Sequence, residues 1–272
     1  MYKFIKRNLL IFTKDKLNIF FSFLGMLIGL TIYIFFLRTT LINSLHFLKN
    51  ADQFMDTWMI PGLISIVSIT SALGILGLKI EDKANNNIYD FKINSNLNNL
   101  KITLSYLITS IIEGVVSTFI FSLIGIAYLA IQYRYNPFNI HYLIICLLNL
   151  LLIIFSSELF LFIINFLKTT TSFSSLSAIV GTISGFLSGT YIIYGELPNF
   201  MQHIIKFWPG FQVAACSRYE LLKAKNFNMN ASMLQSLGIN SNLKNTSILL
   251  IVLIIIFFLF NIALSISKSN KN

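Results

Sequence analysis

Acidic residues, cysteine and proline are all scarce in this sequence. Of 272 residues, 10 are Asp or Glu, 2 are Cys and 4 are Pro, and charged residues of both signs make up 11%. A soluble globular protein carries about twice that share of charge, so a soluble class is excluded. The two cysteines, Cys146 and Cys216, are too few for a disulfide framework, although a single bridge between them is open if both lie on the outer side.

The sequence also lacks the motifs of nucleotide-hydrolysing, metal-dependent and hydrolytic enzymes. There is no GxxxxGK[ST] phosphate loop, no HExxH, no GxSxG and no CxxC. We therefore expect this chain to bind no cofactor, and any ATP and Mg to be held by a partner subunit. The histidines His46, His141 and His203 fall in separate predicted loops without ligand spacing, so we expect no metal site.

Apolar residues dominate what is present. They make up 56% of the chain, and the mean hydropathy is +0.75. Several runs approach or exceed the roughly 20 residues that cross a bilayer as a helix. The sequence predicts an all-α integral membrane protein, one domain over residues 1–272, with six transmembrane helices. The predicted spans are residues 17–37, 58–78, 102–131, 142–167, 173–194 and 248–266.

The N-terminal segment and the basic residues predict the orientation. Residues 1–16 form a basic amphipathic pattern that suits a helix lying in the membrane interface, and the open alternative is a frayed basic tail. Lys and Arg are more frequent in the inter-span segments that share a side with residues 1–16, and five of the Lys and Arg on the other side fall in one long loop. The positive-inside rule then predicts that both termini are cytoplasmic.

Small residues recur at helical spacing in two predicted spans. Gly181, Gly185 and Gly189 follow one another at every fourth position in span five, and Gly25 and Gly29 form a similar pair in span one. Such rows allow another helix backbone to approach closely. They predict a tight contact, made either within the chain or with a second copy in a dimer.

Four polar residues inside the predicted spans are candidates for a transport pathway. Ser65 and Ser68 lie on a hydroxyl-rich face of span two, which either lines a polar pathway or packs tightly. Glu113 and Glu158 lie inside spans three and four. Carboxylates at membrane depth are functional candidates by default. The alternatives are snorkelling of Glu113 to the interface, or hydrogen bonds to neighbouring Ser and Thr.

The segment after span five is too apolar for a free loop and contains two proline breaks. Pro198 and Pro209 flank a short mixed stretch, and Arg218 follows in an amphipathic run. We expect a re-entrant outer segment between spans five and six, where non-helical backbone must be covered by protein or water.

The segment between spans two and three is the most polar predicted inner loop. It contains Glu81, Asp82, Lys83 and Asp90 and extends to residue 101. Its length exceeds that of an ordinary connection between helices. A polar, partly helical loop of this kind suits docking of a cytoplasmic partner.

The order of these features resembles the permease subunit of type-2 ATP-binding-cassette (ABC) transporters, a family that includes bacterial drug, bacteriocin and polysaccharide exporters. The features in order are the interfacial helix, six spans, a polar loop after span two and a proline-broken outer segment after span five. The sharpest matches are Glu81-Asp82-Lys83, Leu197-Pro198, Pro209-Gly210 and Arg218. One departure is Ala84-Asn85-Asn86-Asn87, where the family's inner loop usually has a Gly-Thr or similar pair.

The resemblance implies partners and roles. It implies a dimer of permeases, identical or homologous, in a bacterial plasma membrane with two ATPase subunits beneath. Residues 81–101 and the turn at 168–172, including Lys168, would contact the ATPase. Spans two and five would face the central pathway, spans one and five the second permease, and residues 198–218 would form an outer gate. The expected function is export of a hydrophobic or amphipathic drug, peptide, bacteriocin or lipid-like molecule.

Other functions remain open on the sequence. Within the same family, a polysaccharide export permease is the alternative. From other classes, an ion-coupled carrier or membrane enzyme would use Glu113 and Glu158, and a passive immunity or sensor protein would bind a toxin without moving it. The sequence shows no inverted repeat of the kind common in carriers.

Overall fold

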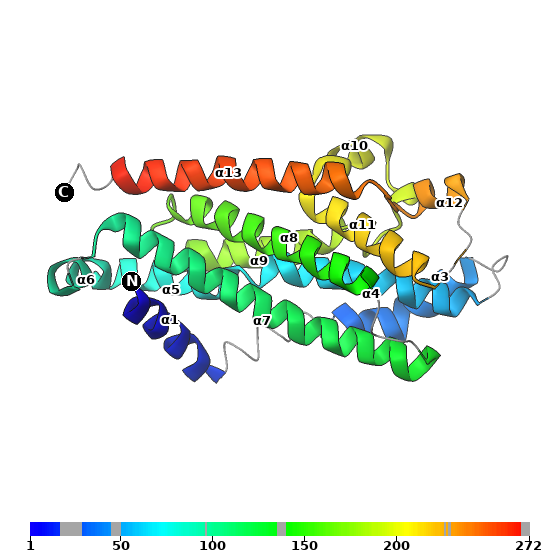
Figure 1. Ribbon diagram of the computed structural model, residues 1–272, viewed down its shortest axis with the longest axis horizontal. Helices are drawn as coiled ribbons and strands as arrows, with labels where there is room; N and C mark the ends of the chain where they lie inside the picture. The colour runs from blue at the N-terminus through cyan, green and yellow to red at the C-terminus, as the bar shows by residue number, and fades with distance from the viewer. Residues whose placement is uncertain are drawn as a thin grey trace.

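The computed structural model describes residues 1–16, 29–44, 50–95, 97–134, 140–225, 227 and 230–267. Every regular element among these residues is helical. The long helices run side by side along the longest axis of the molecule (Figure 1). The N-terminus, α6 and the C-terminal end of α13 lie at one end, and α3 and α12 lie at the other end, with α10 near it. These ends are called below the terminal end and the distal end.

The elements follow the chain in a simple order. Their bounds are α1 Tyr2–Lys14, the π-helical η1 Tyr33–Leu37, α3 Arg38–Ser44, α4 Ala51–Thr70, α5 Leu73–Ala84, α6 Asn87–Ser95, α7 Asn99–Tyr133, α8 Ile140–Ile164, α9 Thr170–Leu187, η2 Tyr194–Glu196, α10 Asn199–Phe207, α11 Pro209–Lys223, α12 Ala231–Ser236 and α13 Leu243–Ser267.

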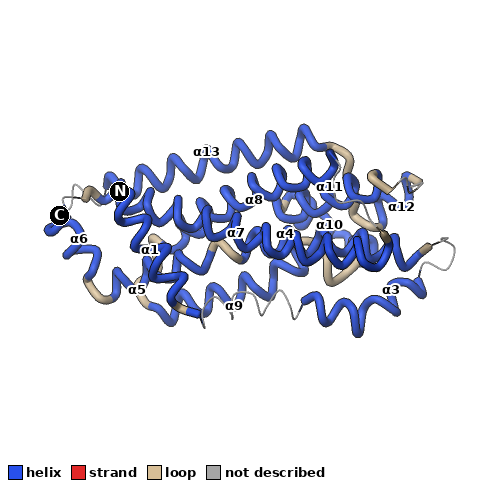
Figure 2. The backbone as a smooth tube through the Cα atoms, turned by 60° about the horizontal axis from the view of Figure 1, so that its bottom comes forward, coloured by secondary structure: helices blue, strands red, loops and turns tan. Residues whose placement is uncertain are grey.

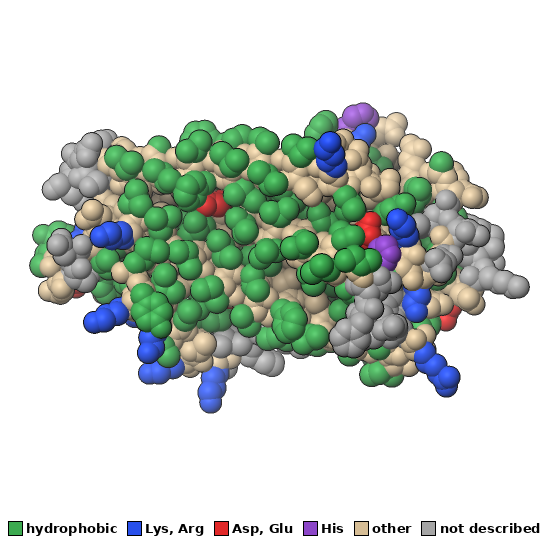
Figure 3. Space-filling view, in the orientation of Figure 1, with side chains coloured by type: hydrophobic (Ala, Val, Ile, Leu, Met, Phe, Trp, Pro, Cys, Tyr) green, Lys and Arg blue, Asp and Glu red, His purple; other side chains and the backbone are tan. Residues whose placement is uncertain are grey.

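Four described helical segments are long and apolar enough to cross a membrane. They are Ala51–Ala84, Asn99–Tyr133, Ile140–Ile164 and Leu243–Ser267, and they coincide with predicted spans two, three, four and six. Figure 3 shows one face of the molecule covered by hydrophobic side chains, with Lys and Arg at its two ends. This pattern is that of a multi-pass membrane protein. Of predicted span one, residues 17–28 lie outside the described residues.

The α4–α5 segment is the centre of the bundle. In its most apolar window 83% of residues are buried, against 11% for α13. Helices α7, α8, α9 and α11 all pack on α4, whereas α13 packs mainly on α8. Figure 2 shows α13 along one edge of the bundle and α9 along the opposite edge. Because α13 exposes most of its apolar side chains, it is placed to face lipid.

Predicted span five is shorter than expected. Helix α9 ends at Leu187 and does not continue to residue 194. Gly189 has φ +60°, and the amides of Gly189 and Thr190 donate to the carbonyls of Phe186 and Gly185. This is a Schellman motif, which terminates a helix at a left-handed residue. The predicted row of three glycines on one helix is therefore wrong at Gly189, which lies beyond the helix.

The two proline breaks in the outer segment lie where the sequence predicts them. Pro198 directly precedes α10, and Pro209 is the first residue of α11. Proline is tolerated at a first helical position because that N–H has no intrahelical partner. Helix α11 is largely buried against α4, α8 and α13, while α10 exposes Phe200, Ile204 and Phe207. The depth of this segment in a membrane stays a prediction.

Candidate functional site

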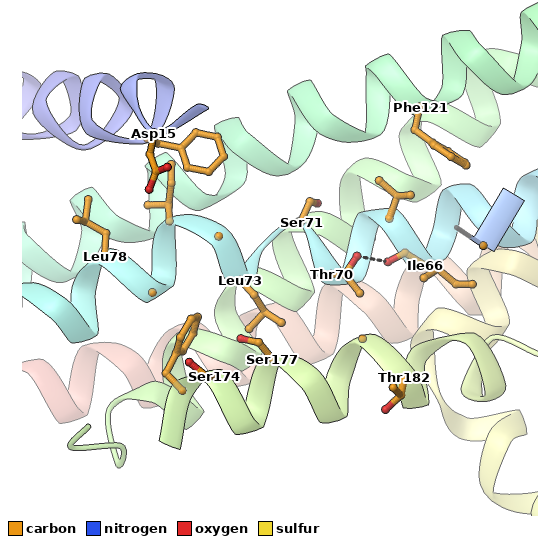
Figure 4. A pocket seen from close by; sticks show the side chains of 18 of the residues that line it. Asp15, Ile66, Thr70, Ser71, Leu73, Leu78, Phe121, Ser174, Ser177 and Thr182 are labelled. Carbon is orange, nitrogen blue, oxygen red and sulfur yellow. Dashed lines mark hydrogen bonds between the residues drawn. The ribbon is translucent and has the colours of Figure 1, made fainter. Parts of the chain in front are cut away.

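A groove of about 1010 Å³ runs between α4–α5 and α9 and reaches the end of α1. Figure 4 shows Ser174, Ser177 and Thr182 of α9 on one wall, with Leu73 and Thr70 of the central helices opposite. The remaining lining is mostly apolar or small. Among the described residues, the charged ones that line it are Asp15 and Glu81, both acidic. A concave, largely apolar site with a few polar groups is the usual form of a small-molecule site.

The central span is broken where it borders this groove. Helix α4 ends at Thr70 and α5 begins at Leu73, with Ser71 and Ala72 between them. The backbone groups freed by the break find partners on α7. The Ser110 hydroxyl donates to the carbonyl of Ala72 at 2.8 Å, and the amide of Ile75 donates to Glu113 Oε2 at 2.7 Å. Such breaks persist in a membrane only where neighbours satisfy the backbone.

Glu113 therefore caps a helix. It is 4% exposed, and its carboxylate lies at the N-terminus of α5, where the helix dipole favours negative charge. A β-carbon at Gly74 would lie 2.0 Å from Glu113 Oε1, so the carboxylate occupies the space that a side chain would need. The sequence alternatives of snorkelling and of hydrogen bonds to Ser or Thr do not describe this arrangement.

Glu158 is also held inside the bundle. Asn261 Nδ2, on α13, donates to Glu158 Oε2 at 2.7 Å and to the Glu158 carbonyl at 2.9 Å. The network continues from Asn261 through Asn165 to Lys79, with N···O distances of 3.3 and 3.0 Å. Neither Glu158 nor Glu113 is among the residues that line the groove.

Ser65 and Ser68 are packed within the bundle and do not line the groove. Both are 0% exposed. Ser65 donates to the Pro61 carbonyl at 3.0 Å, and Ser68 lies 2.9 Å from Asn149 Oδ1 on α8. At these two positions the face packs tightly, with Ser68 against α7 and α8. Ser71, Gly74 and Gly77, farther along the same span, line the groove, so a pathway role of this face stays a prediction.

The predicted glycine contacts are used in different ways. Gly25 lies outside the described residues. Gly29 and Gly181 line the groove, and a β-carbon at Gly181 would meet nothing within 4 Å. A β-carbon at Gly185 would lie 2.0 Å from the ring of Tyr191, in the segment that folds back after α9. Gly185 thus makes a close contact within the chain, and a dimer contact stays a prediction.

Arg218 joins three elements at the distal end of the groove. It is 0% exposed, and its guanidinium lies 4.0 Å from the centre of the Trp58 ring. Its N–H groups donate to the carbonyls of Trp58, Ser188 and Gly189 at 3.2, 3.4 and 3.0 Å. A cation at the C-terminus of α9 is stabilised by the helix dipole. Arg218 thereby locks α11 and α9 to α4, whereas a gating role is untested.

Asp82, one of the predicted docking residues, is instead part of a buried cluster. It is 2% exposed and accepts a bidentate pair from Arg7 at 2.7 and 2.8 Å, with further bonds from Tyr106 and Asn87. Burial would lower the pKa of Arg7, but the hydrogen bonds and charge of Asp82 raise it overall. Asp82 therefore fixes α1, α6 and α7 to α5, and it is not a free contact residue.

The other predicted docking residues are accessible at the terminal end. Glu81, Lys83, Asp90 and Lys168 are exposed. Lys83 Nζ donates to the carbonyl of Leu167 at 2.6 Å. This bond connects the end of α5 to the turn before α9, so the two segments predicted to contact an ATPase lie beside each other.

A second buried polar cluster, around Asp56 at the distal end, is not predicted by the sequence. Asp56 on α4 is 0% exposed and accepts from Arg38 Nε at 3.0 Å and from the hydroxyls of Tyr33, Tyr128 and Tyr133 at 2.6, 2.9 and 2.6 Å. Hydrogen bonds to Asp56, which outweigh the effect of burial, raise the pKa of Arg38. The feature of the sequence that could have indicated this cluster is an acidic residue, Asp56, directly before an apolar run.

Metal and disulfide chemistry find no support in the described part of the chain. It contains no group of three or more His, Cys, Asp or Glu that could hold a metal ion. His141 Nδ1 lies 2.6 Å from Glu220 Oε2, which joins α8 to α11, and His46 is outside the described residues. Cys146 and Cys216 are both free, so the open alternative of a bridge between them is wrong.

A family model described as ABC-2 type transporter matches residues 2–219, from α1 into α11. The chain belongs to the ABC-2 type transporter family. A search of curated proteins gives no match. Membership confirms the resemblance drawn from the sequence, and it makes the chain an ABC transporter permease, which is a transport subunit and generally not itself catalytic. Such permeases in general work with an ABC ATPase.

Proposed function

We propose that this permease is the membrane-spanning subunit of an ATP-driven exporter in a bacterial plasma membrane, and that it moves a hydrophobic or amphipathic molecule out of the cell. A separate subunit binds ATP and Mg and hydrolyses the ATP. The observation that carries the proposal is the groove beside the broken central span, with its apolar walls and serine and threonine hydroxyls.

The groove favours an amphipathic cargo. Its apolar residues offer contacts to a hydrophobic body, while Asp15 and Glu81 place negative charge near the terminal end. A cargo that carries a positive charge on a hydrophobic body fits both features. A polysaccharide would call for aromatic and polar rings along a continuous channel, whereas the four described aromatic residues that line the groove, Phe12, Phe121, Phe173 and Tyr191, lie among mostly aliphatic and small residues.

The exposed residues at the terminal end support docking of the ATPase there. Glu81, Asp90 and Lys168 are exposed on segments that the bond from Lys83 to Leu167 holds together. Movement of the docked ATPase would reach α5 directly, and α5 forms one wall of the groove. In this proposal both termini are cytoplasmic.

The outward face of α9 supports a second permease copy or a homologous partner. Ile179, Ile183 and Phe186 are 53%, 44% and 47% exposed, and Gly181 leaves open space beside the groove. A second copy placed against this face would close the groove into a pathway between two permeases. Either a homodimer or a heterodimer satisfies this geometry.

The test of the function is purification from the native host in mild detergent, followed by reconstitution into vesicles. We expect a P-loop ATPase near one copy per permease by mass spectrometry. We also expect the complex to hydrolyse ATP faster with a lipophilic cationic dye or an amphipathic cationic peptide than with an oligosaccharide. A permease that purifies without an ATPase, or a complex stimulated only by the oligosaccharide, contradicts the proposal.

The bonding of the two carboxylates weighs against an ion-coupled carrier. Glu113 caps α5 and Glu158 is bonded to Asn261, and neither reaches the groove. A carrier should move its cargo without an ATPase, so the same vesicles separate the two functions.

A further inference from the structure

A second cavity, of about 470 Å³, lies at the terminal end on the other side of the bundle centre. We call it the basic pocket. Its walls come from the end of α5, from α6, from the beginning of α7, from Ile164 and Asn165 at the end of α8, and from Ser265 near the end of α13. It shares no lining residue with the groove.

The charged side chains among the described residues that line the basic pocket are all positive. Lys79, Lys83 and Lys92 line it, and none of its described lining residues is Asp or Glu. Lys168 adds a fourth positive charge close enough to interact with Lys83. Lys79 is only 8% exposed, and the amide of Asn165 holds its ammonium at 3.0 Å. Convergent positive charges in a concave site raise the local concentration of anions.

The position of the basic pocket is that of a membrane surface. The apolar segments Ala51–Ala84, Asn99–Tyr133, Ile140–Ile164 and Leu243–Ser267 all begin or end at this level. A small void of about 10 Å³ between α7 and α13 adjoins the basic pocket, since both are lined by Thr103 and Ser265. Its other lining residues include leucines of α7 and α8 and the hydrogen-bonded pair Glu158 and Asn261.

We propose that the basic pocket binds the phosphate of an anionic phospholipid at the membrane surface. The lysines bind the headgroup as point charges, and the Asn86 and Asn99 amides and the Thr103 hydroxyl in the lining add hydrogen-bond donors. Basic pockets between helices at a membrane surface are suited to such headgroups. A soluble phosphate compound would share the charge complementarity and would bind without a bilayer.

The test measures lipid retained by the full-length permease. Protein purified from nanodiscs made of equal parts phosphatidylglycerol and phosphatidylcholine is analysed by native mass spectrometry. We expect about one phosphatidylglycerol held per chain and no preference for phosphatidylcholine. The triple variant Lys79→Gln/Lys83→Gln/Lys92→Gln should hold phosphatidylglycerol about a hundredfold less tightly, because each lysine near the membrane surface contributes about fivefold.

Matched variants control for folding and for total charge. Lys79 is buried, so Lys83→Gln/Lys92→Gln, which leaves Lys79 in place, should lose lipid without loss of thermal stability. The triple variant Lys3→Gln/Lys6→Gln/Lys14→Gln removes the same charge from exposed positions on α1 and should retain lipid as the wild type does. Arginine at positions 83 and 92 should restore binding, because guanidinium also binds phosphate.

Three results would overturn the proposal. One is equal retention of the two lipids by the wild type. Another is equal loss of phosphatidylglycerol from the α1 variant and the pocket variants. The third is protection of the wild type against thermal unfolding by inorganic phosphate alone, with no lipid held, which would assign the pocket to a soluble phosphate compound. Because none of these readouts involves ATP or cargo, the proposal stands or falls independently of the exporter function.

Discussion

The carboxylate of Glu113 occupies the place where a side chain at Gly74 would have to lie, with Oε1 2.0 Å from an ideal β-carbon. The same carboxylate accepts the amide of Ile75 at 2.7 Å. One glycine and one glutamate from two helices thus hold the break in the central span. The break borders the groove on which the proposed transport depends, which gives the pair a structural connection to function.

Glu113→Gln should preserve folding and transport, because the amide oxygen of glutamine still accepts from Ile75. Glu113→Leu should lower the free energy of unfolding by about 1–3 kcal/mol, since it leaves a buried backbone N–H without a partner. The measurements are thermal unfolding in detergent and ATP-driven uptake into inverted vesicles. A Glu113→Gln variant that folds normally but loses transport would show that the carboxylate itself acts in transport.

Gly185→Ala should lower the stability of the permease and Gly181→Ala should not, although the two residues lie only four positions apart on α9. The methyl group at position 185 would collide with the Tyr191 ring, whereas the one at 181 meets open space. We expect Gly185→Ala to cost about 1–3 kcal/mol, as overpacking commonly does, and Gly181→Ala to be nearly neutral. Tyr191→Ala in the Gly185→Ala background should recover part of the loss, and the absence of any recovery would contradict the contact.

Gly181→Leu tests the role of the exposed face of α9 in transport without a change in the stability of the fold. The added side chain enters the groove or the space beside it, so thermal stability should change little while cargo-stimulated ATP hydrolysis falls. If a second permease copy packs on this face, native electrophoresis should also show less dimer. A variant with unchanged hydrolysis and an unchanged oligomer would remove this face from the transport pathway.

Arg218→Gln should destabilise the permease by about 3 kcal/mol or more. The change removes charge-assisted bonds to three buried carbonyls and the contact with the Trp58 ring. Arg134→Gln is the matched control, since Arg134 is exposed at the end of α7, and surface changes usually stay within about 0.5 kcal/mol. Equal unfolding midpoints for the two variants would contradict the locking role of Arg218.

Docking of the ATPase has to be tested at exposed positions only. Asp82→Arg would place two cations together in a buried site and is expected to unfold the terminal end, because breaking a buried pair costs about 3–5 kcal/mol. Glu81→Arg and Asp90→Arg change the charge of exposed residues and should leave the unfolding midpoint unchanged while they weaken co-purification of the ATPase. Normal co-purification with both changes would place the docking site elsewhere.

The membrane class, the central spans and the proline breaks follow from the amino-acid sequence alone. Run length and composition suffice for spans two, three, four and six, because a helix in lipid satisfies its own backbone and needs only about 20 apolar residues. Pro198 and Pro209 act through their own ring geometry, so the positions at which α10 and α11 begin are determined locally. The end of α9 is also a local property, since Gly189 terminates the helix in the left-handed region, but a glycine at helical spacing predicts a packing site equally well.

The roles of the buried polar residues depend on packing between helices that are distant in the sequence. Arg7 and Asp82 are 75 residues apart in the chain, and Glu113 and Ile75 are 38 apart. Asp56 gathers donors from η1, α3 and α7. A carboxylate in an apolar helix has the same sequence signature whether it carries an ion, caps a neighbouring helix or pairs with an arginine. The choice depends on which helix faces it, and that is fixed by packing between segments distant in sequence.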